Sequence, residues 1–310
     1  MFSLDMRVKR LQKLASQLLV VTLVALLSAC ATAPAVVSIH NPPREIPLEV
    51  IENSERPVIA FVLGSGAARG FAHVGVLDVL DRHGIKADIV VGSSSGSVVA
   101  ALYAADIRND ALLDAAQNLN IAELTDWAFP NRGVVRGERL QHYVNQLVQD
   151  QPIEGLPTKF VAVATDLVNG KLTAFNHGNT GMAVRASSSI PGIVQPLTIG
   201  EQEYVDGGLV SPVPVRIARK MGADIVIAVD VSRSRLPHDQ LNSATAVMHQ
   251  AILISMQQIT EAEVQEADVI IRPEVGAILA NEFEQRDQLV EAGKRAALDK
   301  ITIIKQLIFR

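Results

Sequence analysis

The chain has 310 residues, of which 48% are hydrophobic and only 4% are aromatic, and its formal net charge is −5. This length allows a sizeable core in one or two domains, while the acidity and the scarcity of aromatic side chains argue against a nucleic-acid-binding protein. The single cysteine excludes an intramolecular disulfide, and no cysteine and histidine cluster has the spacing of a zinc site.

The first thirty residues are typical of a secretion signal. Basic residues between Arg7 and Lys13 precede an apolar run over residues 18–27, which is too short to span a bilayer comfortably. The run ends in Leu27-Ser28-Ala29-Cys30, which resembles the bacterial lipobox. This resemblance implies a signal peptide over residues 1–29 and a lipidated Cys30 that holds the mature protein to a membrane. Ala31 then implies the bacterial cell envelope, at the periplasmic face of the outer membrane. The alternative is an ordinary signal peptide with a small-residue cleavage site.

Residues 30–56 are rich in proline and lack a core of their own, which predicts a tether. The globular domain is expected to cover residues 57–310. Its first strand is the apolar run Val58–Leu63, and a helix over residues 71–83 follows the turn from Gly64 to Gly70. This turn differs from the dinucleotide-binding pattern G-x-G-x-x-G because its third glycine comes one residue late. In addition, no acidic residue ends the second strand. We therefore favour an oxyanion hole, in which backbone N–H groups point at an acyl oxygen.

The next strand leads into Gly92-Ser93-Ser94-Ser95-Gly96, and a helix of small residues up to Ala105 follows. A strand, a tight turn and a helix with Gly-x-Ser-x-Gly at the turn are typical of a nucleophile elbow, with Ser94 in the bend. A flexible serine-glycine linker is the alternative, but linkers lack an apolar strand on one side and a helix on the other.

The rest of the chain continues the alternation of helices and strands. Helices are expected over residues 111–119, 137–148, 243–266 and 288–307, and strands over residues 160–165, 172–175, 225–231 and 269–271. The order predicts an α/β fold with a mostly parallel central sheet flanked by helices. The irregular stretch over residues 119–137 is either a cap over the active site or a surface excursion.

Asp206-Gly207-Gly208 is the natural partner of Ser94 in a hydrolase. A serine hydroxyl is a weak nucleophile and needs a base, and an aspartate can serve if burial raises its pKa. The two glycines would let the backbone come close to the serine. In isolation, Asp-Gly-Gly is more often a simple tight turn.

Four blocks in order resemble the bacterial branch of the patatin-like phospholipase family over roughly residues 57–235. They are Leu63-Gly64-Ser65-Gly66-Ala67-Ala68-Arg69-Gly70-Phe71-Ala72-His73, Gly92-Ser93-Ser94-Ser95-Gly96, Arg185-Ala186-Ser187-Ser188-Ser189-Ile190-Pro191-Gly192 and Val205-Asp206-Gly207-Gly208. The resemblance implies a three-layer α/β sandwich that cleaves acyl esters of lipids, with a Ser–Asp dyad and no catalytic histidine. Ser94 would be the nucleophile, Asp206 the base, and Gly66 and Ala67 the oxyanion donors. No metal or cofactor is implied.

Two features depart from this pattern or leave roles open. Many members have four consecutive glycines in the first block, whereas Ser65 and Ala67 interrupt that run here, and positive φ is costly for alanine. Arg69 is expected to fix the loop to the sheet through an ion pair, or else to order the loop for function. His73 is expected to pack or to cap.

Two alternatives remain open at this point. A histidine triad would use Asp206 or Asp230 with His238 or His249, but neither histidine follows a strand near the C-terminus. The rival function is a non-catalytic lipoprotein on the same fold that acts as a binding or assembly factor. The sequence leaves the oligomeric state, the head group and the acyl-chain length open.

Overall fold

A computed structural model describes residues 41–52, 55–129, 131–232, 239, 241–275, 278–279 and 281–309. The predicted signal peptide and Cys30 lie outside these residues. Residues 41–310 form one compact unit, in which Leu48 and Ile51 pack against the core and the amide of Ile46 donates to Asn176 Oδ1 at 2.9 Å. The sequence predicts that the globular part begins at residue 57. The compact unit begins sixteen residues earlier, at Asn41.

One sheet organises this unit, and its strands are joined in the order β5-β6-β3-β2-β1-β7-β8, with β4 paired to β3 off this path. Its strands are β1 (Ile59–Leu63), β2 (Ile89–Ser93), β3 (Lys159–Asp166), β4 (Leu172–Phe175), β5 (Leu197–Ile199), β6 (Gln202–Asp206), β7 (Ile225–Val229) and β8 (Val269–Ile271). The pairs β2–β1, β1–β7, β7–β8 and β2–β3 are parallel, whereas β4, β5 and β6 pair antiparallel. The predicted mixed α/β fold with a mostly parallel central sheet is confirmed.

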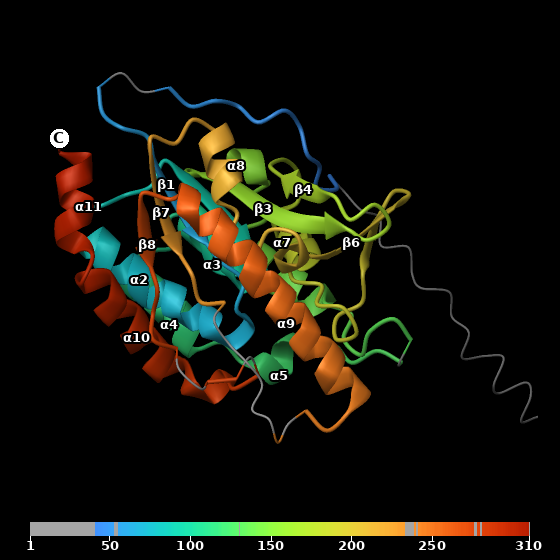
Figure 1. The fold of residues 1–310 in the computed structure, drawn as a ribbon. Coiled ribbons are helices and arrows are strands. Elements are labelled where there is room, and N and C mark those ends of the chain that lie inside the picture. The colour runs from blue at the N-terminus through green and yellow to red at the C-terminus, as the bar shows by residue number, and fades with distance from the viewer. Residues whose placement is uncertain are drawn as a thin grey trace, which may run out of the picture. The chain divides into compact units, whose positions relative to one another are not determined.

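Helices cover both faces of the sheet (Figure 1). Side chains of β1 alternate between two apolar clusters because successive residues of a strand point to opposite faces. Phe61 and Leu63 join the cluster that contains α2, α3 and α10, whereas Ala60 and Val62 join the cluster that contains α8. The helices are α2 (Phe71–Arg82), α3 (Ser95–Ala104), α4 (Asn109–Gln117), α5 (Ile121–Leu124), α6 (Glu138–Leu147), α7 (Thr180–Ser187), α8 (Val215–Lys220), α9 (Ala244–Glu263), α10 (Arg286–Leu298) and α11 (Ile301–Ile308). No helix within the described ranges combines the length and apolar character needed to cross a bilayer.

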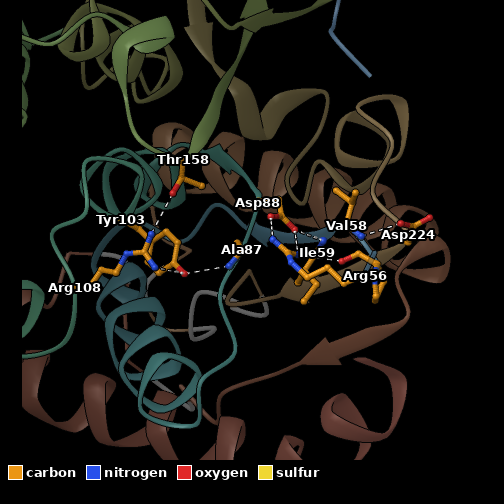
Figure 2. A network of polar contacts seen from close by, with 10 residues as sticks. Arg56, Val58, Ile59, Ala87, Asp88, Tyr103, Arg108, Thr158 and Asp224 are labelled. Atoms are coloured by element: carbon orange, nitrogen blue, oxygen red, sulfur yellow. Dashed lines mark hydrogen bonds and ion pairs between the residues drawn. The ribbon is translucent and has the colours of Figure 1, made fainter. Parts of the chain in front are cut away.

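A polar network holds the N-terminal ends of the parallel strands (Figure 2). The carboxylate of Asp88 accepts hydrogen bonds from the guanidinium of Arg56 at 2.5 and 2.8 Å and from the amide of Ile59 at 2.9 Å. The carboxylate of Asp224 accepts from the amide of Val58 at 2.8 Å. These contacts fix where β1 and β2 begin. At their other ends the same two strands lead into the turns of the candidate site.

The end of the chain differs from the prediction of one helix over residues 288–307. The structure has two helices, α10 and α11, in its place. The amide of Lys300 donates to the carbonyl of Ala297 at 2.9 Å, a tight turn that ends α10. Ile301 and Ile304 are buried, so α11 contributes its own apolar face to the core.

Candidate active site

The chain reverses sharply at Ser94, between β2 and α3. Ser94 has backbone angles of φ 54° and ψ −127°, which non-glycine residues rarely adopt. A Cβ at Gly92 would lie 2.4 Å from the Cα of Ser97, and a Cβ at Gly96 would lie 2.1 Å from the carbonyl oxygen of Leu63. The predicted strand, bend and helix are therefore present, and both flanking positions admit only glycine.

The side chain of Asp206 meets that of Ser94 directly. Ser94 Oγ donates to Asp206 Oδ2 at 2.5 Å, and the amide of Gly208 donates to Asp206 Oδ1 at 2.7 Å. Asp206 lies at the end of β6, where Thr165 Oγ1 on β3 donates to its carbonyl oxygen at 2.8 Å. Burial raises the pKa of Asp206 to about 6, against the lowering effect of the two hydrogen bonds to its carboxylate. The site thus joins a serine hydroxyl to a carboxylate that becomes charged near neutral pH.

The two glycines after Asp206 let its turn pack against the sheet. A Cβ at Gly207 would lie 2.1 Å from the carbonyl oxygen of Val163. A Cβ at Gly208 would lie 2.7 Å from Ser65 Oγ and 3.0 Å from Asp206 Oδ1. The backbone at Gly207 and Gly208 therefore approaches its neighbours as closely as the Asp-Gly-Gly sequence predicts.

The end of α7 supports both members of this pair. Ser187 Oγ accepts a hydrogen bond from the amide of Ser94 at 2.9 Å and donates to the carbonyl of Val163 at 2.6 Å. The carbonyl of Ser189 accepts from the amide of Asp206 at 3.0 Å. The block around residues 185–192 thus holds the bend and the carboxylate in one arrangement. The sequence marked this block only as a family signature, because nothing local indicates what Ser187 contacts.

The loop from Gly64 to Gly70 lies beside Ser94. Some of its backbone amides donate hydrogen bonds to carbonyl groups, and others do not. The amides of Gly64 and Ser65 donate to the carbonyls of Val229 at 3.0 Å and Pro212 at 2.9 Å. The amides of Gly66 and Ala67 have no acceptor among the residues that the structure describes. Both residues line the same cavity as Ser94. The loop therefore offers two uncommitted N–H groups at the positions that the sequence indicated.

The two residues that interrupt the glycine run, Ser65 and Ala67, differ in backbone conformation. Ser65 is not among the residues with positive φ, so a side chain there needs no unusual backbone. Ala67 does adopt positive φ, at 49°. The left-handed region costs alanine about 1–2 kcal/mol relative to its preferred conformations. The loop thus keeps a shape suited to glycine at residue 67, at some expense in stability.

A carboxylate on α9 holds the turn behind this loop. Glu263 is buried; Ser211 Oγ donates to its Oε1, and the amide of Val213 donates to its Oε2 at 3.1 Å. Pro212, between those two partners, is the residue whose carbonyl accepts from Ser65. Burial raises the pKa of Glu263 to about 7, against its hydrogen bonds and the nearby Arg216. The sequence did not single out this residue.

Two basic residues lie in the loop or just after it. Arg69 is 2% exposed, and its Nε and Nη1 atoms have no hydrogen-bond partner in the described part of the chain. Burial lowers its pKa to about 10, partly offset by the charge of Asp230. The ion pair expected to fix Arg69 to the sheet is not formed within 4.0 Å among the described residues, because Asp230 acts from a greater distance. His73 Nε2 contacts the carbonyl of Gly64 at 2.8 Å, and burial lowers the pKa of His73 to about 4, so a neutral ring tethers the loop.

No histidine stands between Ser94 and Asp206, since these two side chains bond to each other. His238 lies outside the described residues. His249, on α9, lines the cavity, and burial together with the charge of Arg69 lowers its pKa. Asp230 instead accepts from Ser232 Oγ at 2.6 Å. The histidine-triad alternative therefore has no support in this geometry.

A cavity of about 770 Å³ opens over Ser94 and Asp206. Its wall is mostly apolar and includes the inner side of α9, through Ile252, Leu253 and Met256. The irregular stretch over residues 119–137 supplies another part of the wall. The stretch was expected to be either a cap over the site or a surface excursion; Leu124 and Val135 line the cavity, whereas Phe129 is exposed on the surface.

The fold agrees with what comparison with known proteins finds. The sequence pattern of the family described as patatin-like phospholipase matches residues 61–219. The chain therefore belongs to the patatin-like phospholipase family.

Sequence relatives agree with this assignment, and a solved structure shares the fold. An uncharacterised NTE family protein of Mycobacterium tuberculosis is 37% identical over 187 residues, which are 59% of this chain and 52% of that protein. Patatin-like phospholipase domain-containing protein 6 of Mus musculus is 34% identical over 181 residues, 56% of this chain and 13% of that protein. The chain thus matches about half the length of the mycobacterial relative. The crystal structure of VipD from Legionella pneumophila shares the fold, with a TM-score of 0.55 and 13% identity, over 88% of this chain and 72% of that one.

Proposed function

We propose that the protein is a serine acyl-ester hydrolase that acts on phospholipids or lysophospholipids through a Ser94–Asp206 dyad. The observation that carries the proposal is the 2.5 Å hydrogen bond from Ser94 Oγ to a buried carboxylate whose pKa is about 6. At neutral pH this carboxylate is largely ionised and can accept the serine proton. Membership of the patatin-like phospholipase family supports lipid acyl esters as the substrate class.

In the first half of the reaction, Ser94 Oγ attacks the ester carbonyl carbon while its proton passes to Asp206. The carbonyl oxygen becomes an oxyanion, which the free amides of Gly66 and Ala67 stabilise by hydrogen bonds. Collapse of this intermediate breaks the bond to the alcohol, which leaves with the proton from Asp206. The acyl group remains bound to Ser94 as an ester.

In the second half, water attacks the acyl carbon and gives a proton to Asp206. The new intermediate collapses, the fatty acid leaves, and the proton returns to Ser94 Oγ. The apolar cavity over the pair accommodates the acyl chain, because burying each CH₂ group there contributes about 0.8 kcal/mol. The strained backbone of Ser94, held by Ser187, keeps the hydroxyl pointed at this cavity.

We further propose that a lipidated Cys30 holds this enzyme at the bacterial cell envelope, on the periplasmic face of the outer membrane. The lipobox-like sequence that ends at Cys30 supports this location. It would bring the site to the membrane that contains its substrates.

Labelling with a fluorophosphonate probe tests the enzyme proposal. The natural protein is expected to take the label on Ser94, and Ser94→Ala is expected to take none. Ser95→Ala is the matched control, because it removes the adjacent hydroxyl and should leave labelling intact. No label on the natural protein, or equal labelling of Ser94→Ala, would favour a non-catalytic binding or assembly lipoprotein on this fold.

A further inference from the structure

The most exposed large apolar side chains of the described chain include two aromatic residues beside the cavity. Trp127 is 74% exposed and Phe129 is 90% exposed, and Ile193 nearby is 45% exposed. Scattered apolar residues are normal on a protein surface, but a group that includes two aromatic rings beside a ligand cavity marks an interaction site. We call the side chains of Trp127, Phe129 and Ile193 the apolar rim.

Backbone pairing joins the two segments that carry the apolar rim. The amide of Ala128 donates to the carbonyl of Val134 at 2.8 Å, and the amides of Val134 and Val135 both donate to the carbonyl of Ile193 at 2.9 Å. The amide of Gln195 donates back to Val135 at 2.8 Å. The same segments line the cavity through Val135, Ile193 and Val194. The apolar rim is therefore a rigid extension of the cavity wall.

Two positive charges flank the rim. Arg136 and Arg139 are exposed and form no ion pair within 4.0 Å among the described residues; together with Trp127 they line a polar groove that meets the cavity wall at Thr125. The acidic residues of this groove are Asp126 and Glu138.

The carboxylate of Asp126 accepts hydrogen bonds from backbone amides. The carboxylate of Asp126 accepts from the amides of Gly137 and Glu138, both at 2.7 Å, and of Arg139 at 3.1 Å at the start of α6. Asp126 and Glu138 also act electrostatically on the half-buried guanidinium of Arg185. Arg136 and Arg139 therefore present exposed guanidiniums at the outer surface, while the carboxylate of Asp126 is bound by the amides that begin α6.

We propose that the apolar rim, flanked by Arg136 and Arg139, is a docking surface for an anionic lipid bilayer, from which substrate enters the cavity. Trp and Phe suit the boundary between water and hydrocarbon, and arginine suits lipid phosphates. The rim is too small for a second copy of the chain: aromatic residues bury about 150–250 Å² each, while a stable interface takes about 800 Å² from each partner. The proposal rests on the proposed lipid hydrolase activity for its purpose, but its test does not measure hydrolysis.

Trp127 is the only tryptophan of the chain, so its fluorescence reports on this surface alone. With the full-length natural protein, we expect its emission to shift to shorter wavelength when vesicles of equal parts phosphatidylglycerol and phosphatidylcholine are added. Brominated acyl chains in those vesicles should quench it. Anchoring at another point of the chain would leave Trp127 in water, so an unshifted and unquenched emission on bound vesicles would overturn the proposal. A shift that depends on protein concentration without vesicles would indicate self-association instead.

Substitutions separate the two parts of the surface. Phe129→Ser is expected to weaken the quenching, whereas Phe309→Ser, which removes a phenylalanine that is 77% exposed near the C-terminus, is expected to leave it unchanged. Arg136→Gln and Arg139→Gln should each weaken partitioning onto the anionic vesicles about fivefold, and should have little effect with pure phosphatidylcholine. Equal behaviour of Phe129→Ser and Phe309→Ser would contradict the proposal. Hydrolysis of a water-soluble short-chain ester, measured on the same variants, tests the enzyme proposal separately.

Discussion

Among single residues, Asp206 decides how the candidate site responds to pH. Its pKa is about 6 in the folded protein, against 3.8 for an ordinary aspartate, because burial disfavours the charged form. The folded state therefore binds this proton more tightly than the unfolded state does. The stability that this gives is fully present below about pH 4 and is lost as the pH rises through about 6. In the proposed mechanism, the ionised form that activates Ser94 is thus the form that destabilises the protein.

We expect the rate of fluorophosphonate labelling to rise with pH through about 6, as Asp206 loses its proton. Asp206→Asn should lower the labelling rate by about 10²–10⁴-fold, which is the range for loss of a general base. The same variant should be more stable than the natural protein at pH 8, by about 2–3 kcal/mol from the two-unit shift. Urea unfolding at several pH values measures this difference.

The stability difference between Asp206→Asn and the natural protein should shrink toward pH 4, where Asp206 is protonated in the folded state but still largely ionised in the unfolded state. Ser95→Ala serves as the control, since it leaves the carboxylate in place. A difference that is constant from pH 4 to pH 8 would show that Asp206 does not titrate in this range. Labelling that is independent of pH would show that another group activates Ser94.

At the scale of elements, α9 both walls the cavity and holds the turn behind the loop from Gly64 to Gly70. Its Ile252, Leu253 and Met256 face the cavity, and its Glu263 holds the turn whose Pro212 carbonyl binds Ser65. The helix is otherwise largely exposed, with few buried residues. Glu263 is therefore a positioning residue that connects a wall of the cavity to the loop beside Ser94.

Glu263→Ala is expected to lower kcat for a short-chain ester about tenfold with little change in KM, because a lost hydrogen bond of about 1.4 kcal/mol in the oxyanion loop corresponds to that factor. Glu263→Gln should restore most of the activity. Its side-chain oxygen can accept from the amide of Val213, and its NH₂ group can donate to Ser211 Oγ. Glu266→Ala, which removes an exposed partner of Arg216, is the matched control. Equal kcat for all three variants would rule out this positioning role.

Local features of the site could be predicted from the sequence, whereas contacts between distant residues could not. The bend at Ser94 was predictable because strand, turn and helix are adjacent in the chain, and Asp206 was found because its two glycines form a local signal. Ser187 and Glu263 gave no such signal: their partners lie 93 and 52 positions away, and a serine or glutamate in a helix does not reveal which turn it faces. The break between α10 and α11 also escaped prediction, because the residues there are ordinary helix formers.

At the scale of the whole molecule, the early start of the compact unit bears on its attachment. Eleven positions separate Cys30 from Asn41, where this unit begins, and a chain of that length reaches at most about 40 Å. If Cys30 carries the lipid, the cavity is thus kept within a few tens of ångströms of the bilayer. The apolar rim then needs to bind only weakly, because the anchor already raises its local concentration at the membrane.

We accordingly expect Cys30→Ser to move the protein from the membrane fraction to the soluble fraction of cells, while fluorophosphonate labelling persists. One docking surface without an acyl anchor holds a protein to a bilayer only marginally. Cell fractionation followed by immunodetection measures the distribution. Full membrane retention of Cys30→Ser would refute lipidation at this cysteine, whatever the outcome of the tryptophan experiment.

The buried carboxylate of Asp206 also bears on how this chain could evolve. An asparagine there would keep the shape of the turn and, by the argument above, would make the protein more stable at neutral pH. A lineage that used the fold only to bind or assemble would therefore gain by a single substitution and would have no reason to avoid it. The chain has instead an aspartate at residue 206 and a strained serine at residue 94, so in the proposed mechanism it keeps turnover at a cost in stability.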